Sequence, residues 1–164
     1  MARLFVAVQL RADVHASLSA LPMPDLEGAR WVDADNWHIT LRFLGDVDPE
    51  LVSERLAGVR LPRARAELGP RVGLLGRGVV MVPVAGLDSL ARRVTEATAD
   101  LGRPPDARGF HGHVTLARLR RPRSLSEIVF GAEFDVNEVV LVDSSRGDAG
   151  SLHRTVASFA LPQR

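Results

Sequence analysis

Two short stretches of alternating polar and apolar residues stand out in the hydropathy pattern of this chain. They lie at residues 37–44 and 112–119, and each reads His, apolar, Thr, Leu, followed by a basic residue and a leucine. Both are rich in β-branched and apolar residues and bounded by turn formers, which predicts strands. Because side chains two apart on a strand share a face, an imidazole and a hydroxyl point the same way from each strand. We interpret the rest of the chain as a scaffold that brings the two strands side by side.

The remaining pattern predicts a mixture of strands and helices. Strands are expected at residues 4–8, 30–32, 64–68, 79–84, 136–142 and 153–161, and helices at residues 11–21, 49–59 and 87–101. Asp48 is the expected N-cap of the second helix, with Pro49 at its first position. Residues 143–151 read as a polar loop. The order of elements indicates two similar halves, each holding one His-x-Thr strand, in an α+β fold. We expect one bilobed domain, residues 1–164, with two mainly antiparallel sheets facing a central cleft.

Composition narrows the function classes. The formal net charge of +1 gives no strong general attraction for nucleic acid. All cationic side chains are Arg, since the chain has no Lys. The absence of Cys excludes disulfides, thiolate metal sites and cysteine nucleophiles. No apolar run approaches the roughly 20 residues that a membrane-spanning helix needs, and residues 1–8 do not read as a secretory signal. We therefore expect a cytoplasmic protein.

A repeated His-x-Thr pair points to acid–base chemistry on a phosphate. One His alone is weak evidence, because most are surface residues or satisfied core residues. Two imidazoles across a cleft can act as general base and general acid in one step, since the unperturbed pKa of imidazole lies near 6.5. Two Thr hydroxyls can donate hydrogen bonds to an anionic oxygen between them. Phosphoryl transfer, with nucleophile and leaving group at opposite ends, fits this arrangement and requires no metal.

The two motifs, read with their surroundings, resemble a known family. The resemblance rests on "RLFVAV" at residues 3–8, on Arg30-Trp31-Val32, on "WHITLRFLGDV" from Trp37, on "GFHGHVTLAR" from residue 109, and on a similar ending at residues 139–161. Together these are similar to the 2H phosphoesterase superfamily, and within it to the RNA 2′,3′-cyclic phosphodiesterases, formerly called 2′-5′ RNA ligases. The resemblance covers nearly the whole chain.

This resemblance implies a fold and an activity. The fold would have pseudo-two-fold symmetry around a cleft that holds both motifs. The activity would be hydrolysis of an RNA-terminal 2′,3′-cyclic phosphate to a 2′-phosphate, by a monomer that needs neither cofactor nor metal, together with reversible 2′-5′ joining of RNA ends. By motif position, His38 would protonate the departing 3′ oxygen and His113 would activate water, while Thr40, Thr115 and Arg118 would bind the phosphate.

Four positions complicate this assignment. Strict alternation places Arg118 on the face opposite His113, so it reaches the cleft only if the strand bends or ends there. Arg42 has the parity to reach the cleft and to add charge to the substrate site. Gly112 stands where the family usually has Pro, which predicts a looser start to the second strand. His153 stands near where an aromatic residue is common.

Other readings remain open at this stage. The substrate could instead be a small cyclic nucleotide or ADP-ribose cyclic phosphate, or the chain could be a non-catalytic module that only binds phosphate or RNA. His111 and His113 form a His-x-His pair of the kind some metal sites use, but a third ligand at recognisable spacing is missing. The basic run at residues 118–123 could contact an RNA backbone or simply be a solvated loop.

Overall fold

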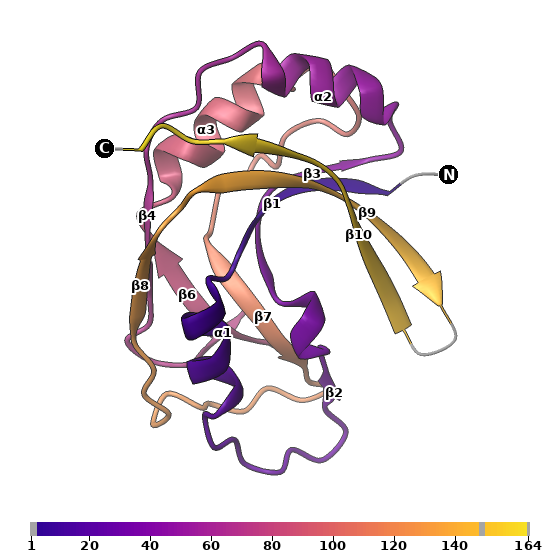
Figure 1. The fold of residues 1–164 in the computed structure, drawn as a ribbon. Helices are drawn as coiled ribbons and strands as arrows, with labels where there is room; N and C mark the ends of the chain where they lie inside the picture. Colours follow the sequence, from indigo (N-terminus) through magenta and orange to yellow (C-terminus); the bar gives the residue numbers. More distant parts are fainter. Residues whose placement is uncertain (1–2, 148–149, 164) are drawn as a thin grey trace.

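A curled antiparallel sheet forms the body of the protein (Figure 1). The computed structural model describes residues 3–147 and 150–163. The strands lie in the order β10-β9-β1-β3-β7-β6-β4-β8, with β2 paired to β7 and β5 to β6. Their bounds are β1 (Leu4–Gln9), β2 (Arg30–Trp31), β3 (His38–Gly45), β4 (Arg65–Leu68), β5 (Gly73–Leu75), β6 (Val79–Ala85), β7 (His113–Arg118), β8 (Ala132–Asp135), β9 (Glu138–Gly147) and β10 (Gly150–Ala160). The expected α+β fold is confirmed, and the two expected sheets are the two halves of this one sheet.

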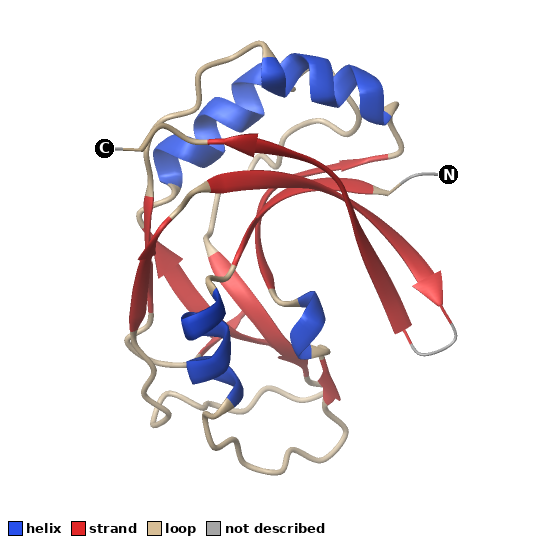
Figure 2. Ribbon diagram, in the orientation of Figure 1, coloured by secondary structure: helices blue, strands red, loops and turns tan. Residues whose placement is uncertain are grey.

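The α-helices of the described residues pack on the sheet (Figure 2); they are α1 (Ala12–Ser19), α2 (Pro49–Ala57) and α3 (Asp88–Ala97). Helix α2 contacts β10, α3 contacts β3, and α1 contacts β8. Helix α2 begins as the sequence predicts, with the Asp48 carboxylate accepting a hydrogen bond from the Glu50 amide at 3.0 Å and Pro49 at the first position. Among the described residues, no helix has the length and apolar character needed to cross a membrane.

Strand β1 lies between two apolar clusters, which explains its continuous apolar sequence. Leu4, Val6 and Val8 belong to the large core shared with the helices. Phe5 and Ala7 point the other way and form a small second cluster together with two residues of β9, Val140 and Val142. This second cluster lies on the same face of the sheet as the two motifs, because Ala7 stands opposite Thr40.

The two halves of the sheet meet where β3 and β7 run side by side. Ile39 and Val114, the middle residues of the two His-x-Thr motifs, form the one residue pair that joins these strands in the described sheet. Both side chains are fully buried. The expectation that the scaffold brings the motif strands side by side is therefore confirmed.

A matching β-bulge follows each motif. Successive residues of β1 pair with Thr40 and Arg42, which leaves Leu41 without an opposite residue. In β7, Leu116 is left out in the same way. A bulge bends its strand and shifts the alternation of side chains by one position. The two bulges thus account for the short contact between β3 and β7, and they send later residues of each strand to the opposite face.

This bulge corrects the expectation for Arg42. The side chain is 5% exposed and points toward the end of α3, away from the face of the motif. Its Nη2 donates to the carbonyl oxygens of Thr98 at 3.1 Å, Leu101 at 3.1 Å and Arg103 at 2.8 Å. A cation at a helix C-terminus is favourable because the last carbonyls there lack helical partners. Arg42 therefore ties α3 to β3 and is not kept as a substrate ligand.

The sequence also missed parts of the sheet. Strands β5 and β8 were not expected, and both are short strands that gain hydrogen bonds only through pairing with β6 and β4. Residues 143–147 and 150–151, expected in a polar loop, continue the ladder between β9 and β10, while residues 148–149 lie outside the described part of the chain. Tertiary pairing overrides the low strand preference of this polar stretch. The expected helix at residues 87–101 ends earlier, at Ala97.

We predict that Arg42→Met destabilises the protein by about 3 kcal/mol, because buried carbonyl groups lose their charged donor. The change should appear as a lower denaturant midpoint with an unchanged slope. Arg92→Met, at an exposed position on α3, is the control and should stay within about 0.5 kcal/mol of the parent. Equal stability of the Arg42→Met variant and the parent would show that these hydrogen bonds do not hold the helix.

Candidate functional site

Four polar side chains of the two motifs gather on one face of the sheet where its halves meet. His38, Thr40, His113 and Thr115 flank the buried pair that joins β3 to β7, and all four are partly exposed. In an antiparallel ladder this register places His38 beside Thr115 and Thr40 beside His113. The two imidazoles therefore lie on one diagonal and the two hydroxyls on the other, with about 7–8 Å across a diagonal in a regular ladder.

Both imidazoles are held by the same local hydrogen bond. The Nδ1 atom of His38 lies 2.7 Å from the carbonyl oxygen of Asn36, and that of His113 lies 2.7 Å from the carbonyl oxygen of His111. A carbonyl oxygen can only accept, so each Nδ1 carries a proton and donates it. When either ring is neutral, its Nε2 is consequently free of a proton. Nε2 is the atom through which each ring can take up or release a proton.

The two rings differ in what surrounds Nε2. His38 Nε2 lies 2.9 Å from the hydroxyl oxygen of Thr40, which donates to it while the ring is neutral. Among the described residues, His113 Nε2 has no hydrogen-bond partner. His113 is thus the imidazole better placed to accept a proton from water or a ligand.

Two further rings surround His38. The Phe5 ring lies 4.7 Å from it, centroid to centroid, with the planes tilted by 31°. The His153 ring, from β10, meets it edge-on at 5.3 Å and 72°, and also meets Phe5 at 5.2 Å. Phe5 is 5% exposed, which leaves little of its surface for a ligand. The sequence offered no signal for this ring cluster, because its three members come from strands far apart in the chain.

Burial and neighbouring charge govern the protonation of His38. Burial lowers the pKa of His38 and outweighs the Asn36 carbonyl, which raises it, and positive charge on His153 or His113 lowers this pKa further. Burial also lowers the pKa of His153. An imidazole whose pKa falls below its ordinary value near 6.5 is mostly neutral at pH 7. In the free protein His38 is therefore a neutral ring, and it gains a proton more readily when an anion lies beside it.

The bulge in β7 determines the face of the sheet on which Arg118 lies. With Leu116 out of register, Arg118 returns to the face of His113 and is exposed at the end of the strand. Phe43 holds the corresponding position in β3, and the guanidinium of Arg103 lies 5.3 Å from the centre of its ring. At this matching position β7 carries a cation that has no ion-pair partner within residues 3–147 and 150–163, whereas β3 carries an aromatic ring.

Gly112 packs closely against Val84 of β6, so the start of β7 is not loose as the sequence predicted. Its carbonyl oxygen accepts a hydrogen bond from the Val84 amide at 2.8 Å. A Cβ at this position would come within 2.4 Å of the Val84 carbonyl oxygen. Glycine permits this close approach of β6 to the residue that precedes His113.

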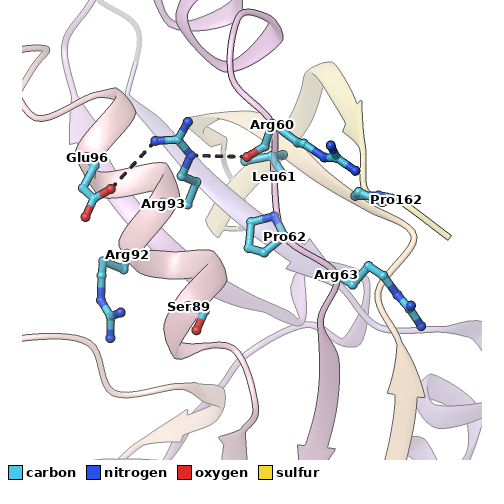
Figure 3. Close-up of a pocket in the computed structure, with 9 residues that line it drawn as sticks. All are labelled: Arg60, Leu61, Pro62, Arg63, Ser89, Arg92, Arg93, Glu96 and Pro162. Carbon is cyan, nitrogen blue, oxygen red and sulfur yellow. Dashed lines mark hydrogen bonds and ion pairs between the residues drawn. The ribbon is translucent and has the colours of Figure 1, made fainter. Parts of the chain in front are cut away.

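Two cavities of the described structure are lined by none of the motif histidines or threonines. One of about 640 Å³ opens between α3 and the segment that follows α2 (Figure 3). It is lined by Arg60, Leu61, Pro62, Arg63, Ser89, Arg92, Arg93, Glu96 and Pro162. A smaller apolar cavity of about 240 Å³ includes Trp31, Trp37 and Leu116. The smaller cavity borders both motifs, because Trp37 precedes His38 and Leu116 follows Thr115.

The fold places two histidines, each with a threonine of the same motif, on one face of the sheet, and comparison with known proteins identifies the family. The chain belongs to the LigT-like phosphoesterase family, whose model matches residues 9–68. An RNA 2′,3′-cyclic phosphodiesterase of Escherichia coli is 32% identical over 98% of this chain and 97% of its own length. A protein of the same name from Aeropyrum pernix is 38% identical over 60% of this chain, and the match spans only 61% of that protein. The crystal structure of E. coli LigT with 3′-AMP superposes with a TM-score of 0.80 and 28% identity over 99% of both chains.

We predict that His153→Asn raises the pKa of His38. The substitution removes a ring that helps to bury His38 and a charge that opposes its protonation, and both changes favour the imidazolium form. NMR titration of the imidazole signals in the ligand-free protein would measure the change. His111→Asn keeps the backbone carbonyl that His113 uses and is the matched control. A His38 pKa that stays the same or falls in the His153→Asn variant would contradict this electrostatic account.

We also predict that Gly112→Ala costs about 1–3 kcal/mol of stability, because the new methyl group meets a backbone oxygen that cannot move alone. The lower stability should be visible in denaturant unfolding. Gly131→Ala is the control, since a Cβ there would meet nothing within 4 Å. Equal losses in the two variants would mean that the approach of β6 is not what requires glycine at position 112.

Proposed function

We propose that this protein hydrolyses the 2′,3′-cyclic phosphate at an RNA end and leaves a 2′-phosphate. The observation that carries the proposal is the pair of imidazoles with matching Nδ1 hydrogen bonds, set diagonally around two hydroxyls on one face. The names of the relatives, RNA 2′,3′-cyclic phosphodiesterases, support the choice of substrate.

The two imidazoles divide the proton work in this mechanism. His113 Nε2 takes a proton from a water molecule as the water oxygen bonds to phosphorus. The bond from phosphorus to the 3′ oxygen breaks, and His38 Nε2–H gives its proton to that oxygen. One proton is accepted and one is donated, so the enzyme ends with the charge it had at the start but with the proton on the other ring. The open Nε2 of His113 supports its assignment as the base.

The other polar groups hold the phosphate. Thr40 and Thr115 donate hydrogen bonds to its non-bridging oxygens, where charge accumulates in the transition state. Thr40 can do so once His38 is protonated, because its hydroxyl no longer has to donate to Nε2. Arg118, exposed on the same face two ladder positions beyond Thr115, adds a permanent positive charge at the edge of the site.

Substrate binding must raise the pKa of His38 so that the ring becomes protonated. Burial keeps this ring neutral in the free protein at pH 7, whereas a general acid has to be protonated. The negative charge of the cyclic phosphate stabilises the imidazolium form and raises the pKa of His38 in the complex. The acid is then charged only when there is an ester to cleave.

The finer points of this proposal go beyond what the relatives' names cover. Joining of RNA ends through a 2′-5′ bond follows if the 5′ hydroxyl of a second RNA replaces water as the nucleophile, with the bond from phosphorus to the 3′ oxygen again breaking. In the reverse of this step the 3′ oxygen attacks phosphorus and the 5′ hydroxyl leaves. The E. coli LigT complex with 3′-AMP involves a mononucleotide, which keeps small cyclic nucleotides as a second candidate substrate. ADP-ribose cyclic phosphate as the substrate and a binding-only role stay alternatives. The monomeric state, the cytoplasmic location and independence from metals or cofactors stay predictions.

We predict that His38→Ala and His113→Ala each lower kcat on an RNA ending in a 2′,3′-cyclic phosphate by at least about 100-fold, the usual loss of a general acid or base. Replacing the departing 3′ oxygen with sulfur separates their roles, since a thiolate leaves without receiving a proton. The sulfur substrate should restore much of the activity of His38→Ala and none of that of His113→Ala.

Matched controls keep this test specific. His15→Ala and His111→Ala remove imidazoles outside the four-residue site and should keep most of the activity. Full activity in either motif variant would refute the mechanism. Rescue of His113→Ala in place of His38→Ala would reverse the two roles. Phosphate binding without turnover from pH 5 to 9 would favour the binding-only alternative.

A further inference from the structure

Two arginines face each other at the edge of the candidate site. In the pairing of β2 with β7, Arg30 stands directly opposite Arg118. Directly opposite residues of an antiparallel pair share a face, with Cβ atoms about 5 Å apart. Both side chains are exposed, and among the described residues neither guanidinium has a carboxylate or other hydrogen-bond partner. The two positive charges are therefore held close together without compensation from the part of the chain that the structure describes.

Strand β2 is fixed in this position by the bulge of β7. The Val32 amide donates to the carbonyl oxygen of Leu116, the bulged residue, at 2.9 Å. Trp31, which precedes Val32 and is the last residue of β2, pairs with Ala117. Its side chain lies on the other face, where it lines the small apolar cavity with Leu116. Arg30 is thereby directed to the face that carries His113 and Thr115.

Like charges placed directly opposite each other destabilise a sheet, and an anion between them removes the repulsion. Two adjacent guanidinium groups offer several N–H donors to the oxygens of one phosphate. A functional explanation is therefore a bound phosphate, and the position along the strand indicates which one.

Arg118 lies two ladder positions beyond Thr115, because Leu116 is bulged out of register, and this corresponds to about 7 Å along a strand. The scissile cyclic phosphate lies at the two motifs. We propose that Arg30 and Arg118 together bind the neighbouring internucleotide phosphate, one nucleotide before the cyclic end. This inference rests on the proposed function and names the substrate class more closely: an oligonucleotide end is preferred to a mononucleotide, which has no such phosphate.

The test compares two substrates that differ only in this phosphate: a 2′,3′-cyclic mononucleotide and a dinucleotide that ends in the same cyclic nucleotide. The parent protein should have the higher kcat/KM on the dinucleotide. Arg30→Gln should reduce the dinucleotide-to-mononucleotide ratio about tenfold, which corresponds to the loss of one charge-assisted contact. Arg92→Gln removes an exposed charge of the same kind from the cavity in Figure 3 and should leave the ratio unchanged.

A second substrate ties the effect to the phosphate itself. Replacing the internucleotide phosphate with a neutral methylphosphonate should lower the dinucleotide ratio of the parent to that of Arg30→Gln, and should have little further effect in that variant. Thermal unfolding confirms that the variant is folded, and Arg30→Lys, which keeps the charge, should restore part of the ratio.

The outcomes separate this inference from the function it rests on. Activity on both substrates with a ratio that Arg30→Gln does not change would overturn the arginine subsite and leave the phosphodiesterase intact. A methylphosphonate effect of the same size in parent and variant would also overturn it. No turnover of either substrate by the parent would overturn the proposed function and the subsite with it.

Discussion

The contact between β3 and β7 is the constraint on which the site depends. One buried pair, Ile39 with Val114, aligns the two motifs so that each imidazole stands beside the other motif's hydroxyl. The bulges just beyond the motifs bend both strands, so the halves of the sheet separate after this contact. A longer ladder would hold the strands together over more of their length and leave less room above the four polar groups. The space for a ligand therefore depends on how little of β3 and β7 is paired.

The sequence correctly predicted those features that depend only on residues close together in the chain. The alternation within each motif correctly indicated strands, and the buried Ile39 and Val114 agree with the expected parity. Arg42 and Arg118 show where this reasoning fails. Arg42 lies four positions after its histidine, and Arg118 lies five positions after its own. Because of the bulge that follows each motif, Arg42 points toward the helices and Arg118 lies on the open face. Bulges arise from the pairing of strands distant in sequence, so alternation within one strand could not predict them.

The surroundings of His38 were beyond sequence reasoning for a different reason. Its Nδ1 partner is a backbone carbonyl, a group that every residue carries, so no residue type marks it. Its ring neighbours, Phe5 and His153, come from opposite ends of the chain. Their combined burial and charge lower its pKa, which a sequence motif cannot express. The motif therefore identifies which residues can react, and the tertiary packing determines their protonation state in the free protein.

The connection through Arg42 has a consequence for how the protein unfolds. Helix α3 comes from the second half of the chain, between β6 and β7, yet its C-cap residue Thr98 and two residues after it accept hydrogen bonds from a side chain of β3, in the first half. Neither half can open by itself without exposing the carbonyl groups that Arg42 satisfies. The two halves should accordingly exchange their protected amide hydrogens in a single cooperative event, despite the narrow seam between them in the sheet.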